Sequence, residues 1–236
     1  MKDATILTAD AVLFDMDGTL IDSTVVVERT WRAFAGRHGL DPDEILATAH
    51  GRRTEETVAR YLPEGIDVVA ETRRIVAEEV ADTAGVVAVP GAAELLASLP
   101  RRRWAMVTSA GRALARRRMA AAGLPFPPVV ITAEDVLAGK PAPEGYLAAA
   151  DALGVSAAAT VIFEDAEAGL RSAVASGATT VVVGGHNGPA AEGLLRVSDF
   201  HAVAVTVDQT DQAPLQLRLA AAAPLNGNSD HASCHL

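Results

Sequence analysis

The sequence predicts an α/β protein whose core is a parallel β-sheet and whose first crossover carries an inserted helical cap. Three observations support this prediction. Short apolar runs alternate with helical patterns, glycines end several of those patterns, and the segment between the first two runs has only helical periodicity. Alternating strands and helices are typical of parallel sheets. The apolar runs span residues 11–15, 104–109, 129–132, 160–165 and 179–184.

Helical patterns separate the later apolar runs. They cover residues 112–122, 144–153 and 166–176, and each is followed by a glycine, namely Gly123, Gly154 and Gly177. A glycine just past a helix accepts the left-handed conformation of a C-terminal cap. Two weaker strands are expected near the end of the chain, over residues 202–207 and 215–219.

The segment from residue 21 to residue 85 is expected to fold as a separate cap. Its helical patterns span residues 25–39, 43–49, 54–61 and 68–84. A parallel crossover needs only one helix, whereas four can fill an independent lobe. We therefore expect a core domain built from residues 1–20 and 86–221 and an inserted four-helix cap domain.

Aromatic residues of the expected cap have a structural interpretation. Trp31 and Phe34 stand at helical spacing, so we expect them in the core of the cap rather than against a substrate. His38 is expected on a cap helix or on the cap surface.

Composition restricts the partners and the compartment. The formal net charge of −10 opposes binding to nucleic acid or to an anionic membrane. The N-terminus lacks a signal-peptide pattern, and no apolar run is long enough to span a bilayer. We expect a soluble cytoplasmic protein that is a monomer or a weak homodimer.

The C-terminal segment 222–236 is polar and aperiodic, and we expect it to be disordered. It holds the single cysteine, Cys234, so no disulfide can form within the chain, which fits a reducing compartment. A soft-metal site of His231, Cys234 and His235 is not expected, because a loose tail offers the ligands no supporting contacts.

Two carboxylates follow the first apolar run, in the segment Phe-Asp-Met-Asp-Gly-Thr-Leu at residues 14–20. At the end of a strand the backbone turns, so Asp15 and Asp17 can face one cleft. Close carboxylates repel each other and need a cation or a shared proton. Mg²⁺ is a suitable cation, because it binds one or two carboxylates together with phosphate oxygens. The alternative without a functional role is a pair of solvated aspartates before a glycine turn.

Further polar groups follow the next three apolar runs. They are Thr108 and Ser109, Lys140, and Glu164 with Asp165. The carboxyl ends of parallel strands share one edge of a sheet, so we expect these groups to meet Asp15 and Asp17 there. Lys140 stands out because the chain has only two lysines among 20 basic residues, which suggests that a compact ammonium is required.

This set of groups suits phosphoryl transfer. We predict that Asp15 is the nucleophile, that Asp17 acts as the general acid and base, and that Lys140 balances charge. Thr108 would donate its hydroxyl, and the N–H groups of Ser109 and Ala110 would face the phosphate. The predicted Mg²⁺ ligands are Asp15, Asp17, Glu164 and Asp165. Singly, Thr108 could merely cap a helix, and Glu164 with Asp165 could merely complement a helix dipole.

Four segments resemble the four motifs of the haloacid dehalogenase superfamily, in order and spacing, over about residues 10–184. They are residues 14–20, Val-Thr-Ser at 107–109, Lys-Pro-Ala-Pro at 140–143, and Phe-Glu-Asp-Ala-Glu-Ala-Gly at 163–169. The resemblance implies a Rossmann-like core with the Asp15 strand in its middle, a closing cap, Mg²⁺ as cofactor and an aspartyl-phosphate intermediate. Ala166 stands where many relatives have serine.

The cap segment His-Gly-Arg-Arg-Thr at residues 50–54 is similar to that of glycerol- and sugar-phosphate phosphatases. This similarity implies that His50, Gly51 and Arg53 touch the substrate. Arg53 would bind the part of the substrate distant from phosphorus, or clamp the phosphate when the cap closes.

The leading functional hypothesis is a phosphatase, a phosphoric monoester hydrolase that acts on a small sugar or polyol phosphate. A phosphomutase of the β-phosphoglucomutase type shares every catalytic group and stays open as an alternative. A receiver-like phosphoacceptor domain also uses aspartate, threonine and lysine with Mg²⁺. The expected cap and Asp17 argue against that third interpretation.

Overall fold

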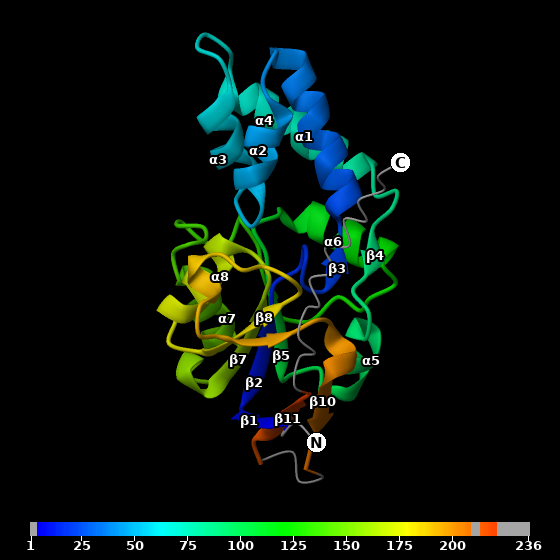
Figure 1. Cartoon of the computed structure of the whole chain (residues 1–236), viewed down its shortest axis with the longest axis vertical. Helices are drawn as coiled ribbons and strands as arrows, with labels where there is room; N and C mark the ends of the chain where they lie inside the picture. The colour runs from blue at the N-terminus through cyan, green and yellow to red at the C-terminus, as the bar shows by residue number, and fades with distance from the viewer. Residues whose placement is uncertain (1–3, 209–212, 221–236) are drawn as a thin grey trace, which may run out of the picture.

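A computed structural model describes residues 4–208 and 213–220 of the chain. The expected tail, with His231, Cys234 and His235, lies outside these residues. A lobe of four helices stands above a larger α/β lobe (Figure 1). In the described part of the chain, no helix has the length and apolar character needed to cross a membrane.

The larger lobe is built on a six-stranded parallel sheet with the order β6-β5-β2-β7-β8-β9. The expected α/β class is confirmed. The central strand β2 places Phe14 beside Met106 of β5 and Phe163 of β7. The strands are β2 (Ala11–Phe14), β5 (Trp104–Val107), β6 (Val130–Ile131), β7 (Thr160–Glu164), β8 (Thr179–Val183) and β9 (Leu195–Val197).

Both faces of this sheet are buried, as is usual for parallel sheets. Alternate residues of β2 face opposite sides: Leu13 packs with Tyr146 of α7, whereas Phe14 stacks on Phe163 at a centroid distance of 5.4 Å. The helices of the larger lobe are α5 (Ala92–Ser98), α6 (Arg112–Ala121), α7 (Glu144–Ala152) and α8 (Glu167–Ala175). Short 3₁₀ helices occupy Ala157–Ala159, Pro189–Ala191 and Phe200–Ala202.

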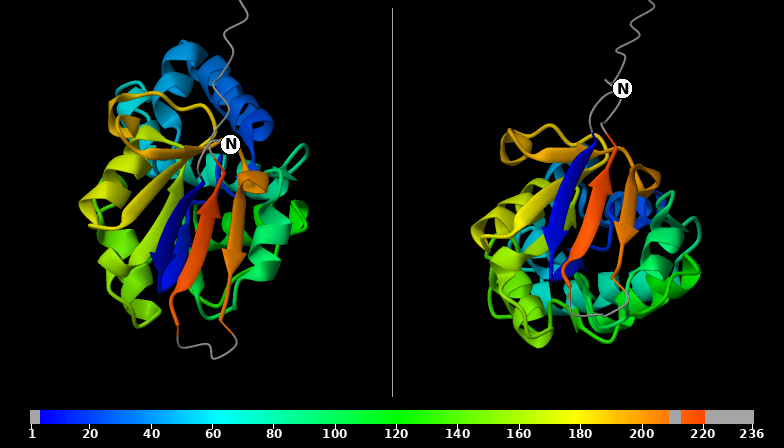
Figure 2. Two further views of the ribbon diagram at one scale, coloured as in Figure 1. Left: turned by 60° about the horizontal axis from the view of Figure 1, so that its bottom comes forward. Right: turned by 90° about the horizontal axis from the view of Figure 1, so that it is seen from below.

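The last two expected strands do not extend the parallel sheet. They are β10 (Val203–Thr206) and β11 (Leu215–Leu219). β11 pairs antiparallel with both β1 (Thr5–Ala9) and β10, in the order β1-β11-β10 (Figure 2). The alternation of β11 buries Leu215, Leu217 and Leu219 against the core. Sequence reasoning missed β1 and β9, because each is short and partly exposed.

The upper lobe contains α1 (Thr24–His38), α2 (Pro42–Ala49), α3 (Thr54–Tyr61) and α4 (Val68–Ala81), close to the predicted spans. Trp31 and Phe34 are buried in its core, with ring centroids 5.6 Å apart. Trp31 also lines the cavity beneath the lobe, so the expectation that it lies away from a substrate holds only for Phe34. His38 lies at the end of α1 and contacts Glu71 of α4 at 3.1 Å. The chain enters and leaves the lobe through a two-stranded antiparallel ribbon, β3 (Ile21–Asp22) with β4 (Val87–Ala88).

Candidate active site

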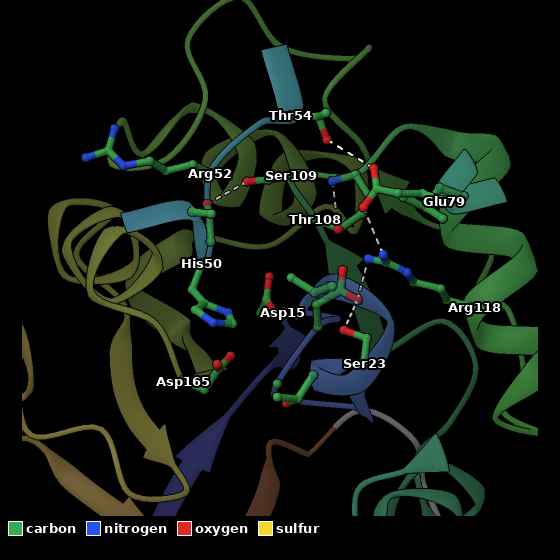
Figure 3. A pocket seen from close by; sticks show the side chains of 18 of the residues that line it. Asp15, Ser23, His50, Arg52, Thr54, Glu79, Thr108, Ser109, Arg118 and Asp165 are labelled. Carbon is green, nitrogen blue, oxygen red and sulfur yellow. Dashed lines mark hydrogen bonds and ion pairs between the residues drawn. The ribbon is translucent and has the colours of Figure 1, made fainter. Parts of the chain in front are cut away.

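The predicted site residues of the core meet at the carboxyl edge of the parallel sheet. Asp15 directly follows β2, Thr108 directly follows β5, and Asp165 directly follows β7. Since β2 pairs in register with both β5 and β7, the residues after these strands are neighbours. Figure 3 shows them around one cavity beneath the helical lobe.

Lys140 lies between two carboxylates. Its Nζ donates hydrogen bonds to Asp15 Oδ1 and, at 2.6 Å, to Glu164 Oε1. The ring of Tyr146 covers the ammonium group at 5.3 Å. Lys140 and Asp15 are buried, and Glu164 has no exposed surface. A buried carboxylate requires such a partner, because an unpaired charge is very costly away from water.

One lysine does not balance this acidic group. Burial raises the pKa of Asp15 to about 8, although Lys140 acts in the opposite direction. Burial and the charges of Glu164 and Asp15 raise the pKa of Asp165 well above its usual range. Burial favours the neutral amine of Lys140, but Asp15 and Glu164 outweigh it and raise the pKa of the lysine. A second cation would therefore stabilise the ionised carboxylates.

The carboxylates have the composition of a site for a hard cation. Asp15, Glu164 and Asp165 each offer one oxygen, and these oxygens lie within 4.8 Å of one another. Carboxylate oxygens are suitable ligands for Mg²⁺. Glu164 is already held by Lys140 and by the backbone N–H groups of Asp165 and Ala166, at 2.7 and 2.8 Å. Glu164 is therefore engaged by more hydrogen-bond donors of the described residues than Asp15, which meets Lys140, or Asp165, which meets Thr19.

Asp17 is not part of this group of three oxygens. Its Oδ1 accepts hydrogen bonds from Ser23 Oγ at 2.7 Å and from Arg118 Nη1 at 2.8 Å. Its side chain is 27% exposed and lines the cavity. The sequence placed Asp17 among the metal ligands, whereas the structure pairs its carboxylate with an arginine.

Two glycines permit the close approach of these carboxylates. Gly18 has φ +89°, and a Cβ there would lie 2.0 Å from Asp165 Oδ2. A Cβ on Gly169 would lie 1.6 Å from Glu164 Oε1. Thr19, beside Gly18, donates its hydroxyl to Asp165 Oδ1 at 2.8 Å. Only glycine leaves room for the neighbouring carboxylates at these two motif positions.

The segment after β5 differs in part from the sequence-based expectation. Thr108 lines the cavity, but its Oγ1 accepts the N–H of Ala110 at 3.0 Å, so that N–H is engaged within the loop. Helix α6 begins only at Arg112. Ser109 donates its hydroxyl to the carbonyl of Gly51 at 2.8 Å and so binds the cap.

The cap loop 50–53 lies over the core. His50 and Gly51 line the cavity beside Asp15 (Figure 3). Arg53 does not line this cavity; its guanidinium donates to the carbonyls of Val136 at 2.9 Å and Leu137 at 3.2 Å. Arg53 thus joins the cap to the loop that precedes Lys140, and the structure gives it no contact with the reacting centre.

Sequence reasoning missed two buried charges that line the cavity. Arg118 of α6 donates to Glu79 of α4 at 3.0 Å, and both residues are buried. A signal was available: Arg118 lies on the same helix face as the buried residues Leu114 and Ala115. Glu79 follows Ile75 by four residues on the buried face of α4. A charge on an apolar helix face indicates a specific partner.

The cavity has a volume of about 140 Å³. Core residues form its floor and cap residues form its roof. A parallel α/β core, an acidic site with a buried lysine at the strand ends, and a helical lobe over that site together define a capped α/β enzyme.

The model of haloacid dehalogenase-like hydrolases matches residues 9–177 of the chain, which therefore belongs to this family. The resemblance inferred from the four motifs is confirmed, as is the expectation of a hydrolytic enzyme. Membership of a hydrolase family removes the receiver-like alternative.

Named relatives are similar over most of their lengths. Hexitol phosphatase A of Escherichia coli (strain K12) is 43% identical over 182 residues, which is 75% of this chain and 83% of the relative. The 2-deoxyglucose-6-phosphate phosphatase 1 of Saccharomyces cerevisiae is 37% identical over 196 residues, with 73% and 79% covered.

Solved structures share the architecture. CbbY from Rhodobacter sphaeroides in complex with phosphate has a TM-score of 0.70 and 25% identity, covering 81% of this chain and 95% of that one. β-Phosphoglucomutase from Clostridium difficile also has a TM-score of 0.70, at 22% identity, covering 81% and 92%. The second likeness concerns the fold alone.

Proposed function

We propose that this protein is a Mg²⁺-dependent phosphatase that hydrolyses a small sugar or polyol phosphate through an aspartyl-phosphate intermediate. The observation that carries the proposal is the buried Asp15–Lys140 pair at the end of the central strand, beside Asp165 and beneath the cap. Relatives named as hexitol and 2-deoxyglucose-6-phosphate phosphatases support the substrate class.

In the first step, an Asp15 carboxylate oxygen attacks phosphorus, and the bond from phosphorus to the ester oxygen breaks. Lys140 holds Asp15 in place and offsets the negative charge of the transferring group. Asp17 gives its proton to the departing alcohol oxygen. In the second step, Asp17 takes a proton from a water molecule whose oxygen attacks phosphorus. The bond from phosphorus to the Asp15 oxygen breaks, which frees phosphate and restores the Asp15 carboxylate.

The donor set fits Mg²⁺, with Asp15 and Asp165 as direct ligands and Glu164 as a direct or water-mediated one. When bound, the ion supplies positive charge that screens the carboxylates from the anionic substrate. Thr19 orients Asp165 by donating its hydroxyl at 2.8 Å.

The cavity beneath the cap, of about 140 Å³, suits a phosphate and the groups next to it. His50, Arg52 and Asp165 also line a neighbouring hollow of about 660 Å³, which leaves room for the rest of a sugar or polyol chain. The polar lining of the smaller cavity includes Asp17, Ser23, His50 and Glu79, which suits hydroxyl groups. A cap also excludes bulk water from the first step.

A phosphate-release screen over sugar and polyol monophosphates, with Mg²⁺ and with excess EDTA, tests the proposal. We expect release that requires the metal. Absence of release from every phosphomonoester, or full activity in EDTA, would contradict it. Product analysis with a hexose 1-phosphate tests the phosphomutase alternative, which would produce the hexose 6-phosphate in place of free phosphate.

A further inference from the structure

The buried pair of Glu79 and Arg118 forms one wall of the active-site cavity. Arg118 Nη2 donates to Glu79 Oε1 at 3.0 Å, and Arg118 Nη1 donates to Asp17 Oδ1 at 2.8 Å. Thr54 donates its hydroxyl to Glu79 Oε2 at 3.2 Å. Glu79, Thr54 and Arg118 all line the cavity, on the side opposite His50 (Figure 3).

Both members of the pair keep unused hydrogen-bonding capacity. The Nε–H of Arg118 is buried and has no acceptor in the part of the chain that the structure describes. An ionised carboxylate has about four lone-pair sites, and Glu79 uses two of them in the hydrogen bonds above. A hydroxyl group both donates and accepts, so a carboxylate beside a guanidinium complements it.

Stability alone gives little reason for this pair. Removing two charges from water is costly, and well-packed apolar residues stabilise such a position at least as well. The interior of the same lobe has apolar residues at such positions. Ile75, one turn before Glu79, packs with Trp31 and Phe34. The ion pair instead occurs where α4 meets the cavity.

The position of the pair fixes which part of a substrate it meets. Arg118 contacts Asp17, the residue proposed to protonate the ester oxygen. Groups bonded close to that oxygen must therefore lie near Arg118 and Glu79. Helices α4 and α6 also contact each other through Arg117 Nε and the carbonyl of Val80 at 3.3 Å.

We propose that Glu79 and Arg118 recognise the hydroxyl on the carbon next to the phosphorylated carbon, and that they make the enzyme selective for 2-hydroxyalkyl phosphates. This inference rests on the proposed phosphatase function and specifies the substrate class. Glu79 accepts a hydrogen bond from the hydroxyl group, and Arg118 donates one to the hydroxyl oxygen. The hydroxyl thereby fixes the ester oxygen beside Asp17.

Three small substrates test the inference with the unmodified enzyme: propane-1,2-diol 1-phosphate, propane-1,3-diol 1-phosphate and propyl phosphate. They differ only in the place or presence of one hydroxyl. We expect kcat/KM for the 1,2-diol phosphate to exceed the other two by about tenfold to a hundredfold, because a hydrogen bond to a charged group is lost in each.

The Glu79→Gln variant tests the residue. We expect it to lower the ratio of kcat/KM for the 1,2-diol phosphate to kcat/KM for propyl phosphate by about tenfold or more. Glu71→Gln is the matched control, since Glu71 is a buried glutamate of the same helix that pairs with Arg37 at 2.9 Å, away from the cavity. The control should keep the full preference for the 1,2-diol phosphate. Melting temperatures of both variants show whether each is folded.

Each outcome decides one question. If all three substrates are hydrolysed at equal rates, the hydroxyl is not recognised and only the phosphatase proposal stands. If Glu79→Gln lowers all three substrates equally, Glu79 merely positions Arg118 and Asp17, and selectivity lies elsewhere. If none of the three is hydrolysed, although other phosphomonoesters are, the 2-hydroxyalkyl class is wrong. Absence of activity on every phosphomonoester overturns both proposals.

Discussion

At the scale of single residues, the site depends on contacts that leave no space. Glu164 is held at once by Lys140 Nζ and by two backbone N–H groups, and Gly169 of α8 lies directly against its carboxylate. The Glu164 carboxylate is therefore held on several sides, so a small addition of volume at Gly169 must displace it.

Gly169→Ala should destabilise the protein and impair activity. The added Cβ would lie 1.6 Å from Glu164 Oε1, and overpacking of this kind costs about 1–3 kcal/mol. The displaced Glu164 would also move Lys140. Gly36→Ala is the matched control, because Gly36 lies in α1 with open space around it. This control should gain roughly 0.5–1 kcal/mol. Urea denaturation of both variants measures the effects; equal stability of the two would contradict the prediction.

Asp15→Asn should abolish turnover without unfolding the protein. The amide keeps the volume of the carboxylate but cannot serve as the nucleophile. Phosphate release measured beside the melting temperature separates the two effects. Release within about tenfold of the unmodified enzyme would remove Asp15 from the nucleophile role.

At the scale of elements, the sequence was most informative where one local pattern sufficed. The four helices of the cap and the strands that end at Phe14 and Glu164 were predictable, because their periodicity and their motifs lie in contiguous segments. β1 (Thr5–Ala9) could not be predicted in this way. Its partner β11 is about 200 residues away in the sequence, and Thr5–Ala9 forms a strand only through this pairing.

The site residues also divide into those that a local pattern predicts and those that depend on the packing of distant elements. Asp15, Lys140 and Asp165 could be predicted because each follows its own strand or motif. The Glu79–Arg118 pair could not be assigned, since the pairing depends on how α4 of the cap packs on α6 of the core. The partners of Arg53 are likewise backbone carbonyls, for which residue type gives no signal.

Arg53→Ala should weaken the contact between the cap and the core. The variant loses both hydrogen bonds to the loop at residues 136–137. Since those bonds hold the cap and not the substrate, we expect kcat/KM to fall by about threefold to thirtyfold. The fall should be the same for a polyol phosphate and for an aryl phosphate.

Arg32→Ala is the control for this change, because Arg32 is a half-exposed arginine of α1 whose ion pair with Asp43 lies within the cap. It should leave both substrates unaffected. A selective loss with the polyol phosphate in Arg53→Ala would instead support the direct substrate contact that the family resemblance implies.

At the scale of the whole molecule, the protein encloses its acidic site between two lobes. Burial there raises the pKa of Asp15 to about 8, whereas an aspartate of the unfolded chain ionises near pH 4. Between these values the folded protein binds more protons than the unfolded chain. The free energy of unfolding must then decrease as the pH rises through this window.

The metal-free protein should therefore melt at a lower temperature at pH 8 than at pH 5. Mg²⁺ should raise the melting temperature more at pH 8, because at pH 5 it must first displace the proton from Asp15. The control is Asp15→Asn, which has no carboxyl to titrate at this position. Its melting temperature in EDTA should decline less between pH 5 and pH 8. The difference between the two proteins then gives the contribution of Asp15 apart from those of the histidines and of the net charge.

A Mg²⁺-induced shift of equal size at both pH values would show that Asp15 is already ionised in the metal-free protein. Lys140 alone would then supply the charge that we assign to the ion.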